Sequence, residues 1–412
     1  MFKKILHIFL ILVVGVCVGA CAMFGSAMIP TENIRKNIQA SIEEPCNEGY
    51  TYNPGFQNRG GTVDIFTDSI ILFACCNERT TSVIEHSMNV EVVKDKPVQN
   101  LYNYLNGEEV KTDEYARYWH GYQVILKPLL SVFSYNTVKI INCVLQFFLF
   151  TVIVVLLLKK KMIGYAIAYG VMYSSIAPLS VGICMQYSPV YYIASIAVIL
   201  ALIKSELVEK YLLYYFLVIG MLTSFMDLLT YPLFTLGIPL IFVVELGDNK
   251  GWNIKKIFSA SFMWGIGYAV MWTSKWIVAS LLLHRNVLSN AIGAASYRTG
   301  TKNGLYDIYI ADIFVDCFYE IGIWKYLLLC IVIFVICVIV ERRIPLIKKY
   351  LIIIGMLPFM WAIVIKNHTY VHSWFTYRIF GIFLVCLIAF ILYNSYNFVL
   401  YEKKENLEKI KS

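Results

Sequence analysis

The stretch TVDIFTDSIILFACC, residues 62–76, decides how the rest of the chain is interpreted. It carries two carboxylates, Asp64 and Asp68, and then continues as an apolar run over residues 70–76. A helix that crosses a bilayer needs about 20 apolar residues, so this run is too short to span one. We therefore expect a helix that lies against a membrane surface or packs on membrane helices, with its acids at the rim.

The composition of the whole chain is that of a helical membrane protein. Of its 412 residues, 59% are hydrophobic and 15% are charged, whereas soluble domains carry about 25% charged residues. The net charge of +8 comes largely from short Lys and Arg clusters between apolar runs. Such clusters keep cytoplasmic loops inside during membrane insertion. The basic excess therefore reflects topology, and it predicts no nucleic-acid partner.

Ten apolar runs predict an all-α polytopic protein with about ten transmembrane helices. The first run, residues 5–29, follows Lys3 and Lys4. It is longer than the apolar core of a cleaved signal peptide, which has about 7–15 residues, so we expect a retained span that begins on the cytoplasmic side. The other nine predicted spans are residues 138–158, 162–184, 189–203, 211–229, 232–244, 257–283, 323–340, 350–365 and 375–400.

If the N-terminus is cytoplasmic and each span crosses the membrane once, the Lys and Arg clusters of the short loops all lie on the cytoplasmic side. This predicts a multi-pass protein of the plasma (inner) membrane with both termini in the cytoplasm. We expect one transmembrane domain over residues 1–412, with residues 401–412 as a cytoplasmic tail. The outer face then carries a long first loop with juxtamembrane helices, residues 31–135, and a second loop, residues 284–322.

Asp64 and Asp68 lie four residues apart, so they share one face if the segment is helical. Two interpretations of Asp68 stay open. It caps a helix that starts at Ser69, or it acts as a general base, because a carboxylate half-buried at a membrane surface has a raised proton affinity. One residue can do both, and Asp64 is the second candidate for the base.

The end of the first outer loop, residues 112–134, predicts an amphipathic helix at the membrane surface, capped by Thr112 or Asp113. It contains the segment YARYWHG, in which Arg117 and His120 lie among aromatic residues. Arg can bind a lipid phosphate bidentately at that depth. The alternative is that Tyr and Trp only anchor the helix at the interface while Arg117 extends toward water. That alternative leaves His120 unexplained.

Other charged residues are candidates on the same face. Asp227 lies near the outer end of the predicted span 211–229. A charged residue inside a span usually faces a cavity or a partner, which makes Asp227 a functional candidate. The alternative is that it pairs with Lys275 or another buried cation. In the second outer loop Arg298 and Lys302 could contact phosphate, although a solvated loop needs no such role.

The segment KNHTYVHSWFTYR, residues 366–378, places His368 and His372 on one helix face, and Arg378 follows. Two His residues so spaced need a third ligand to hold a metal. Contacts with phosphate or hydroxyl groups fit this setting better, so we predict no metal site and no cofactor. One disulfide stays open in the first outer loop, if that loop faces an oxidising compartment, among Cys46, Cys75 and Cys76.

Four segments, FTDSIIL, YARYWHGYQVILKPLL, MDLLTYPLFTLGIPL and NHTYVHSWFTYR, look like segments of bacterial polytopic membrane proteins described as GT-C-like. The layout of one span, a long outer loop with surface helices and a bundle of spans resembles the GT-C superfamily of membrane glycosyltransferases. This resemblance implies a polyprenyl phosphate or diphosphate sugar donor and an acid of the first outer loop as base. That acid would be Asp68, with Asp64 second. The chain has no adjacent Asp-Glu or Asp-x-Asp, which leaves the base and any metal dependence open.

Two classes of function remain. In the enzyme, Asp68 deprotonates a hydroxyl of an envelope glycan or lipid acceptor, and basic side chains stabilise the lipid phosphate that leaves. In the alternative, a flippase or transporter of lipid-linked sugars, Asp227 and the basic groups line a path through the bilayer. Polar groups cluster on one membrane face, which favours the enzyme, with the sugar donor, the acceptor and membrane lipids as partners. The substrate-binding candidates are Arg117, His120, Asp227, His368, His372 and Arg378.

Overall fold

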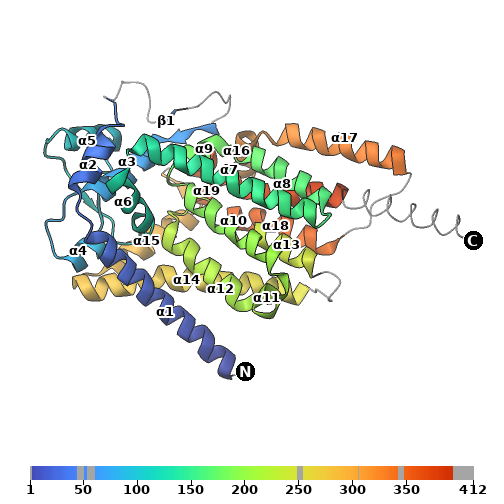
Figure 1. The fold of residues 1–412 in the computed structure, drawn as a ribbon, viewed down its shortest axis with the longest axis horizontal. Coiled ribbons are helices and arrows are strands. Elements are labelled where there is room, and N and C mark those ends of the chain that lie inside the picture. Colours follow the sequence, from blue (N-terminus) through green and yellow to red (C-terminus); the bar gives the residue numbers. More distant parts are fainter. Residues whose placement is uncertain are drawn as a thin grey trace, which may run out of the picture.

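The computed structural model describes residues 2–43, 51–52, 61–247, 254–304, 306–341 and 348–392. These residues form an almost entirely helical protein, in which long helices run side by side and shorter helices gather at one end (Figure 1). The predicted tail 401–412, the basic clusters at Arg342–Arg343 and Lys403–Lys404, and Cys46 lie outside the described residues.

Four helical segments are long and apolar enough to cross a membrane. A fifth crossing is present if two helices that meet at 74° are counted as one broken span. The bend falls at Gly322, whose φ of 63° is left-handed and therefore suits glycine. The four are α1 (Phe2–Ala27), α7 (Tyr135–Lys159), α14 (Ile254–Leu283) and the segment Ser373–Leu392, and the bent pair is α16 (Ile310–Ile321) with α17 (Ile323–Glu341).

The predicted helical fold class is therefore confirmed, and four or five helices have the length and composition of membrane spans. The ten predicted spans are not all confirmed. Five further helices in the predicted spans have 13 to 16 residues. At 1.5 Å per residue they measure about 20–24 Å, less than the hydrocarbon core of about 30 Å. They are α8 (Ile163–Ser175), α10 (Ser188–Ile203), α12 (Leu212–Met226), α13 (Phe234–Leu246) and α18 (Lys349–Val364).

The predicted span 162–184 is broken in the structure. Helix α8 ends at Ser175, and the short helix α9 (Pro178–Ile183) begins three residues later. A proline disfavours helical backbone at the residue before it, and Ala177 has a φ of 54°. The break sends the chain into the turn between α9 and α10, which carries much of the candidate site.

Helices α12 and α14 approach very closely. A Cβ atom built on Gly220 would lie 2.1 Å from the carbonyl oxygen of Trp264, and one on Gly267 would lie 2.1 Å from the carbonyl oxygen of Leu217. Only a residue without a side chain fits at either position, which is how small residues bring membrane helices together. This contact fixes the position of α12, whose end leads into the Asp227 turn.

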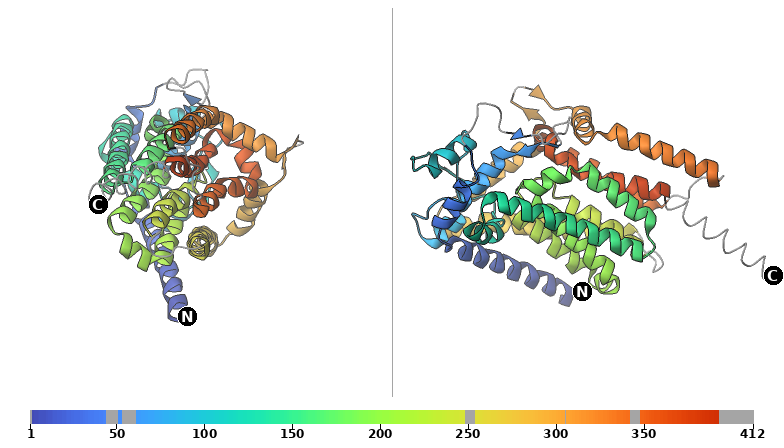
Figure 2. Two further views of the ribbon diagram at one scale, coloured as in Figure 1. Left: turned by 90° about the vertical axis from the view of Figure 1, so that its right-hand side faces the viewer. Right: turned by 45° about the horizontal axis from the view of Figure 1, so that its top comes forward.

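The described residues of the predicted first outer loop, 31–135, form a compact cap at one end of the bundle (Figures 1 and 2). Helix α3 (Ile65–Cys76) is its centre, because Ser69 and the run from Ile71 to Cys76 are buried against α2, α5 and α6. Of the two expected placements, a membrane surface or packing on membrane helices, the first does not hold, because other cap helices cover α3. Its first turn does contact a candidate span, since the hydroxyl of Tyr135 on α7 donates to Asp68. The cap helices are α2 (Glu32–Gln39), α3, α4 (Val83–Met88), α5 (Pro97–Leu105) and α6 (Gln123–Val132).

Three short antiparallel strand pairs complete the described structure. One of them overturns the predicted cap at Thr112 or Asp113, because Asp113 belongs to a strand and the helix that follows begins only at Gln123. The pairs are β1 (Thr51–Tyr52) with β2 (Val63–Asp64), β3 (Glu91–Val92) with β4 (Asp113–Glu114), and β5 (Lys302–Asn303) with β6 (Tyr306–Asp307). The remaining helices are α11 (Ser205–Lys210), α15 (Val287–Thr299), α19 (Lys366–Val371), α20 (Ser373–Thr376) and the 3-10 helix η3 (Tyr377–Phe380).

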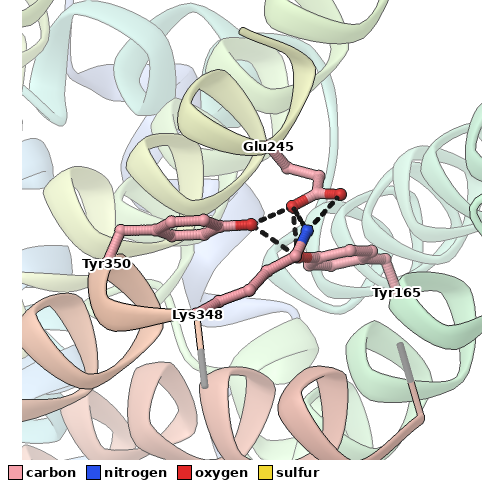
Figure 3. Close-up of polar contacts among 4 residues, drawn as sticks. All are labelled: Tyr165, Glu245, Lys348 and Tyr350. Carbon is pink, nitrogen blue, oxygen red and sulfur yellow. Dashed lines mark hydrogen bonds and ion pairs between the residues drawn. The ribbon is translucent and has the colours of Figure 1, made fainter. Parts of the chain in front are cut away.

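A polar cluster joins three helices at the end of the bundle away from the cap (Figure 3). Glu245, on α13, forms an ion pair of 2.8 Å with Lys348, which precedes α18. The hydroxyl of Tyr165 on α8 donates to the same carboxylate at 2.6 Å, and the hydroxyl of Tyr350 donates to it as well. Lys348 contacts both oxygens of this carboxylate, and the two tyrosines bind one of them, so Glu245 holds α8, α13 and the start of α18 together.

Candidate functional site

Asp64, and not Asp68, caps helix α3. The helix starts at Ile65, and the side chain of Asp64 accepts a hydrogen bond of 2.9 Å from the backbone N–H of Thr67. Asp64 ends strand β2 with non-helical backbone angles, which is the geometry of an N-cap residue. The interpretation of Asp68 as the cap of a helix starting at Ser69 is therefore wrong, because Asp68 already lies in the first turn.

The carboxylate of Asp68 is 3% exposed and accepts from four donors. The hydroxyl of Tyr135 and the backbone N–H of Met185 donate to Oδ2 at 2.6 and 3.0 Å. The backbone N–H of Gln186 and the thiol of Cys184 donate to Oδ1 at 3.2 and 3.4 Å. Asp68 thus ties α3 to α7 and to the turn between α9 and α10. We call these five residues the Asp68 cluster.

Burial raises the pKa of Asp68 to about 6, although the Tyr135 and Met185 donors pull it down. Burial also raises the pKa of Asp64, whose Oδ2 accepts from the side-chain amide of Gln186 at 2.5 Å. A carboxylate with a pKa near 6 is mostly ionised at neutral pH but holds its proton far more tightly than an exposed Asp. This is the protonation behaviour that a general base at neutral pH needs.

Asp227 lies in the turn that follows α12, outside the helix in which it was predicted. Its carboxylate accepts from the backbone N–H of Thr230 at 3.0 Å and from the Thr230 hydroxyl at 2.5 Å. The alternative that Asp227 pairs with Lys275 is wrong, because the Lys275 ammonium donates to the carbonyl of Met88 at 2.9 Å. Asp227 instead closes its own turn.

His368 binds this same turn. Its Nε2 lies 2.7 Å from the carbonyl oxygen of Leu229, so Nε2 carries the proton. Burial, with smaller contributions from His372 and Arg298, holds the pKa of His368 well below its ordinary value. Burial and Arg298 lower the pKa of His372 to about 4. Both rings are therefore neutral at pH 7 and can donate or accept hydrogen bonds without bringing charge.

The two His rings lie 4.7 Å apart, centre to centre. Within the described ranges no three His, Cys, Asp or Glu side chains come close enough together to hold a metal ion. Arg298, on α15, faces these rings and places its guanidinium 5.3 Å from the centre of the Tyr118 ring. Its Nη1 atom is buried without a hydrogen-bond partner among the described residues. We call Tyr118, Asp227, Arg298, His368 and His372 the Asp227 cluster.

His120 supports the loop between β4 and α6. Its Nε2 donates to the carbonyl of Tyr115 at 2.9 Å and its Nδ1 accepts from the hydroxyl of Tyr122 at 3.0 Å. Burial lowers the pKa of His120 to about 3, so the ring is neutral. Tyr118 and Trp119 are buried as well, so they do not lie at a membrane surface as the anchoring alternative requires.

Arg117 and Arg378 differ in their surroundings. Arg117 packs its guanidinium over the Tyr115 ring at 4.5 Å and donates to the side chain of Asn290 at 3.3 Å near the surface. Arg378 is fully buried, donates to the carbonyl of Ile176 at 3.0 Å, and lies 4.2 Å from the centre of the Tyr187 ring. Arg117 is therefore open to a ligand, whereas Arg378 mainly braces the start of the last span.

Tyr187 joins the two clusters. It follows Gln186 of the Asp68 cluster in the chain, and its carbonyl accepts from the hydroxyl of Tyr231 at 2.7 Å, next to the Asp227 turn. The structure thus brings Asp64, Asp68, Asp227, His368 and Arg378 into one connected polar layer at the cap end of the bundle, and His120 reaches it through Tyr118.

An apolar groove of about 450 Å³ runs beside this layer between α6, α7, α10 and α12. Several of its lining side chains are exposed on the outside of the bundle. At its polar end the groove reaches Met185, whose N–H binds Asp68, and Tyr122, whose hydroxyl binds His120. Sequence reasoning missed this groove because its walls come from four separate segments. The exposed lining residues are Ile125, Leu145, Ile196 and Leu222.

Comparison with known proteins leaves the geometry to carry the functional argument. No family model, no curated protein and no solved structure matches the chain. The features that indicate a function are the buried acids, the Nη1 atom of Arg298 and the apolar groove.

Proposed function

We propose that the protein is an inverting GT-C-type glycosyltransferase that moves a sugar from a polyprenyl-phosphate donor to an extracytoplasmic glycan or lipid acceptor. In this proposal it has ten passes through the plasma membrane and both termini are cytoplasmic, with the five short helices completed by their flanking residues. The observation that carries the proposal is the apolar groove, which opens on the side of the bundle and ends at the turn held by Asp68.

The groove has the properties of a site for a lipid chain. It is walled by aliphatic and aromatic side chains, and burial of such surface is favourable by about 25 cal/mol per Å². A chain that lies along Leu145 and Ile196 places its head near Met185 and Tyr122. The phosphate and the sugar of a lipid-linked donor would then meet the polar layer that contains Asp68 and Asp227.

Asp68 is the better candidate for the base, because Asp64 is occupied as the helix cap. An acceptor hydroxyl has to replace one of the four donors that now bind Asp68. The hydroxyl of Tyr135 is the one side-chain O–H among them, and it is the group that an acceptor hydroxyl would mimic. Asp68 would take the acceptor proton while the acceptor oxygen attacks the anomeric carbon and the C–O bond to the lipid phosphate breaks.

The leaving phosphate needs positive charge. Arg298 offers a buried Nη1 without a partner among the described residues, and Arg117 offers a guanidinium near the surface. Preorganised donors of this kind stabilise charge that develops in the transition state. The neutral rings of His120, His368 and His372 supply hydrogen bonds and no charge. Arg378 donates to backbone carbonyls and packs on the Tyr187 ring, so in this proposal it positions Tyr187 and does not contact the phosphate itself.

The test uses the full-length protein in nanodiscs with undecaprenyl phosphate that carries labelled hexoses, and an envelope fraction as acceptor. Asp68→Asn should lower the transfer of label at least about 100-fold, the range for loss of a general base. Tyr135→Phe is the matched control, because it removes the hydroxyl that binds Asp68 and keeps the carboxylate. It removes a donor that lowers the pKa of Asp68, so transfer should persist and its rising pH limb should move to higher pH.

Undiminished transfer by Asp68→Asn would remove Asp68 from the mechanism. A second variant tests the groove: Ile196→Trp fills it and should raise the KM for the donor while kcat changes little. Movement of the lipid-linked sugar across the bilayer without release of polyprenyl phosphate would show that the protein is a flippase or transporter and not a glycosyltransferase.

A further inference from the structure

We propose that the cap binds a phosphate-bearing anion in a basic pocket beside the outer end of α1, separate from the Asp68 and Asp227 clusters. The pocket has a volume of about 470 Å³ and lies where the end of α1 meets α2, α4, α6 and the residues after α3. Its basic lining side chains are Arg35, Arg79, His86 and Lys127. This proposal stands whether or not the protein transfers sugars.

Lys127 is the central observation. Its side chain is 0% exposed, it lines the pocket, and its Nζ has no hydrogen-bond partner and no ion pair among the described residues. A buried ammonium without a partner is costly, and burial lowers the pKa of Lys127 accordingly. A bound anion would supply the acceptor that the ammonium lacks among the described residues.

Arg35 adds a second unsatisfied donor at the same pocket. Its Nη2 donates to the hydroxyl of Tyr104 at 2.7 Å, but its Nε is buried without a partner among the described residues. Arg79 is exposed at the rim. Burial, and then the nearby charge of Lys127, lowers the pKa of His86 to about 4, so this ring is neutral at pH 7 and contributes no charge of its own.

Two carboxylates also line the pocket, and neither occupies it. Glu32 is 80% exposed in its side chain and pairs with Lys36 at 2.8 Å. Glu78 is 70% exposed in its side chain and lies 3.5 Å from Arg35. Both acids extend into solvent, while Lys127 is fully buried. The bottom of the pocket is therefore positive, and the acids at its edge do not neutralise Lys127.

The position of the pocket along α1 indicates which anion can reach it. The candidate span in α1 has 25 residues, or about 37 Å at 1.5 Å per residue, and the hydrocarbon core measures about 30 Å. The end of α1 therefore reaches the headgroup layer. Ala27 and Met28 line the pocket there, and Met28 is 68% exposed. A lipid phosphate could enter while its acyl or prenyl chain lies along α1.

The pocket is distinct from the candidate catalytic layer. Lys127 interacts electrostatically with Cys75 and Cys76 at the end of α3, whereas Asp68 lies in its first turn. Cys76 follows Asp68 by eight positions in the same helix, a rise of about 12 Å. A phosphate held by Lys127 would therefore orient a lipid or a soluble phosphate ester at the cap without contacting Asp68.

The experiment measures binding by the full-length protein to two probes. One probe is inorganic phosphate, titrated against the protein in detergent. The other is phosphatidylglycerol, exchanged into phosphatidylcholine nanodiscs and counted by native mass spectrometry. Lys127→Met removes the ammonium and keeps the length of the side chain, and Lys111→Gln is the matched control because Lys111 is an exposed lysine of the same cap.

We expect at least one probe to bind saturably, with affinity about tenfold weaker in Lys127→Met and unchanged in Lys111→Gln. Tighter binding of phosphatidylglycerol identifies a lipid headgroup, and tighter binding of inorganic phosphate identifies a soluble ester. Lys127→Met should fold as well as the parent, because it removes an uncompensated buried charge. Equal binding by Lys127→Met, or no saturable binding of either probe, would overturn the proposal.

Discussion

The replacement of Asp68 by Asn should change the pH dependence of stability by a predictable amount. Burial moves the pKa of Asp68 from its ordinary value of 3.8 to about 6 in the folded protein. The shift of about 2 units corresponds to roughly 3 kcal/mol, since one unit is about 1.4 kcal/mol. Because the folded pKa is raised, this stability is present below pH 3.8 and is lost as the pH rises through about 6.

Asn is neutral at every pH, so the variant does not undergo this loss. Its carbonyl oxygen can keep the bonds from Tyr135 and Met185, while its amide group faces the N–H of Gln186. That mismatch costs about 1–3 kcal/mol at all pH values. Between about pH 5 and about pH 8 the parent protein should lose roughly 1.5 kcal/mol relative to the variant. This is about half of the full shift, because the other half is already lost between pH 3.8 and about pH 5, where Asp68 ionises in the unfolded chain but not in the folded protein.

The assay is unfolding by SDS in mixed micelles, at four pH values and constant salt, for the parent protein and Asp68→Asn. The difference between the two free energies of unfolding removes the contributions of Asp64 and of the His residues, which titrate in both proteins. A difference that is flat from pH 5 to pH 8, or one that favours the parent more at high pH, would refute the burial argument. The same data show whether the variant is folded when its transfer activity is measured.

Two further predictions concern packing and the polar cluster of Figure 3. Gly220→Ala should destabilise the protein by about 1–3 kcal/mol, because the new methyl group would meet the Trp264 carbonyl. Gly265→Ala is the control: its methyl group would meet nothing within 4 Å, so it should be neutral or slightly stabilising. Thermal unfolding in detergent compares the two variants. Lys348→Ala should cost about 2 kcal/mol by leaving Glu245 without its cation, and the added change Glu245→Gln should recover part of that loss. Equal effects of the two glycine changes, or no recovery in the double variant, would contradict these arguments.

The sequence was a good guide to the helices and a poor guide to their ends. Apolar runs located the membrane helices because burial in lipid needs only composition and length. The break before Pro178 was visible as a proline, yet the apolar character of residues 162–184 hid it. The left-handed bend at Gly322 depends on one residue within a continuous apolar segment. Length correctly excluded a span for α3, but its burial depends on α2, α5 and α6, which are distant in the sequence.

The sequence predicted which residue types form the candidate site, but it did not predict which residues contact one another there. Asp68 and Asp227 were identified because acids are rare near spans, but the donors that hold Asp68 include backbone amides, which no sequence pattern reveals. Arg298 was one of two loop residues that could contact phosphate, but the sequence did not place it near the two His rings, whose pKa values it lowers. Lys127 was taken as part of an amphipathic surface helix, and only the packing of α6 against α3 shows that it is buried.

In the proposed mechanism, Asp68 combines a structural and a chemical role for one physical reason. The donors that hold it at the α9–α10 turn favour its charged form, while burial disfavours that form more strongly, and the pKa of about 6 is the balance of the two. A fully exposed Asp would not hold the turn, and an equally buried Asp without donors would stay protonated at neutral pH. The same contacts that make Asp68 part of the fold therefore give it the proton affinity of a base, and an acceptor hydroxyl that replaces the Tyr135 hydroxyl would meet a carboxylate already ionised at pH 7.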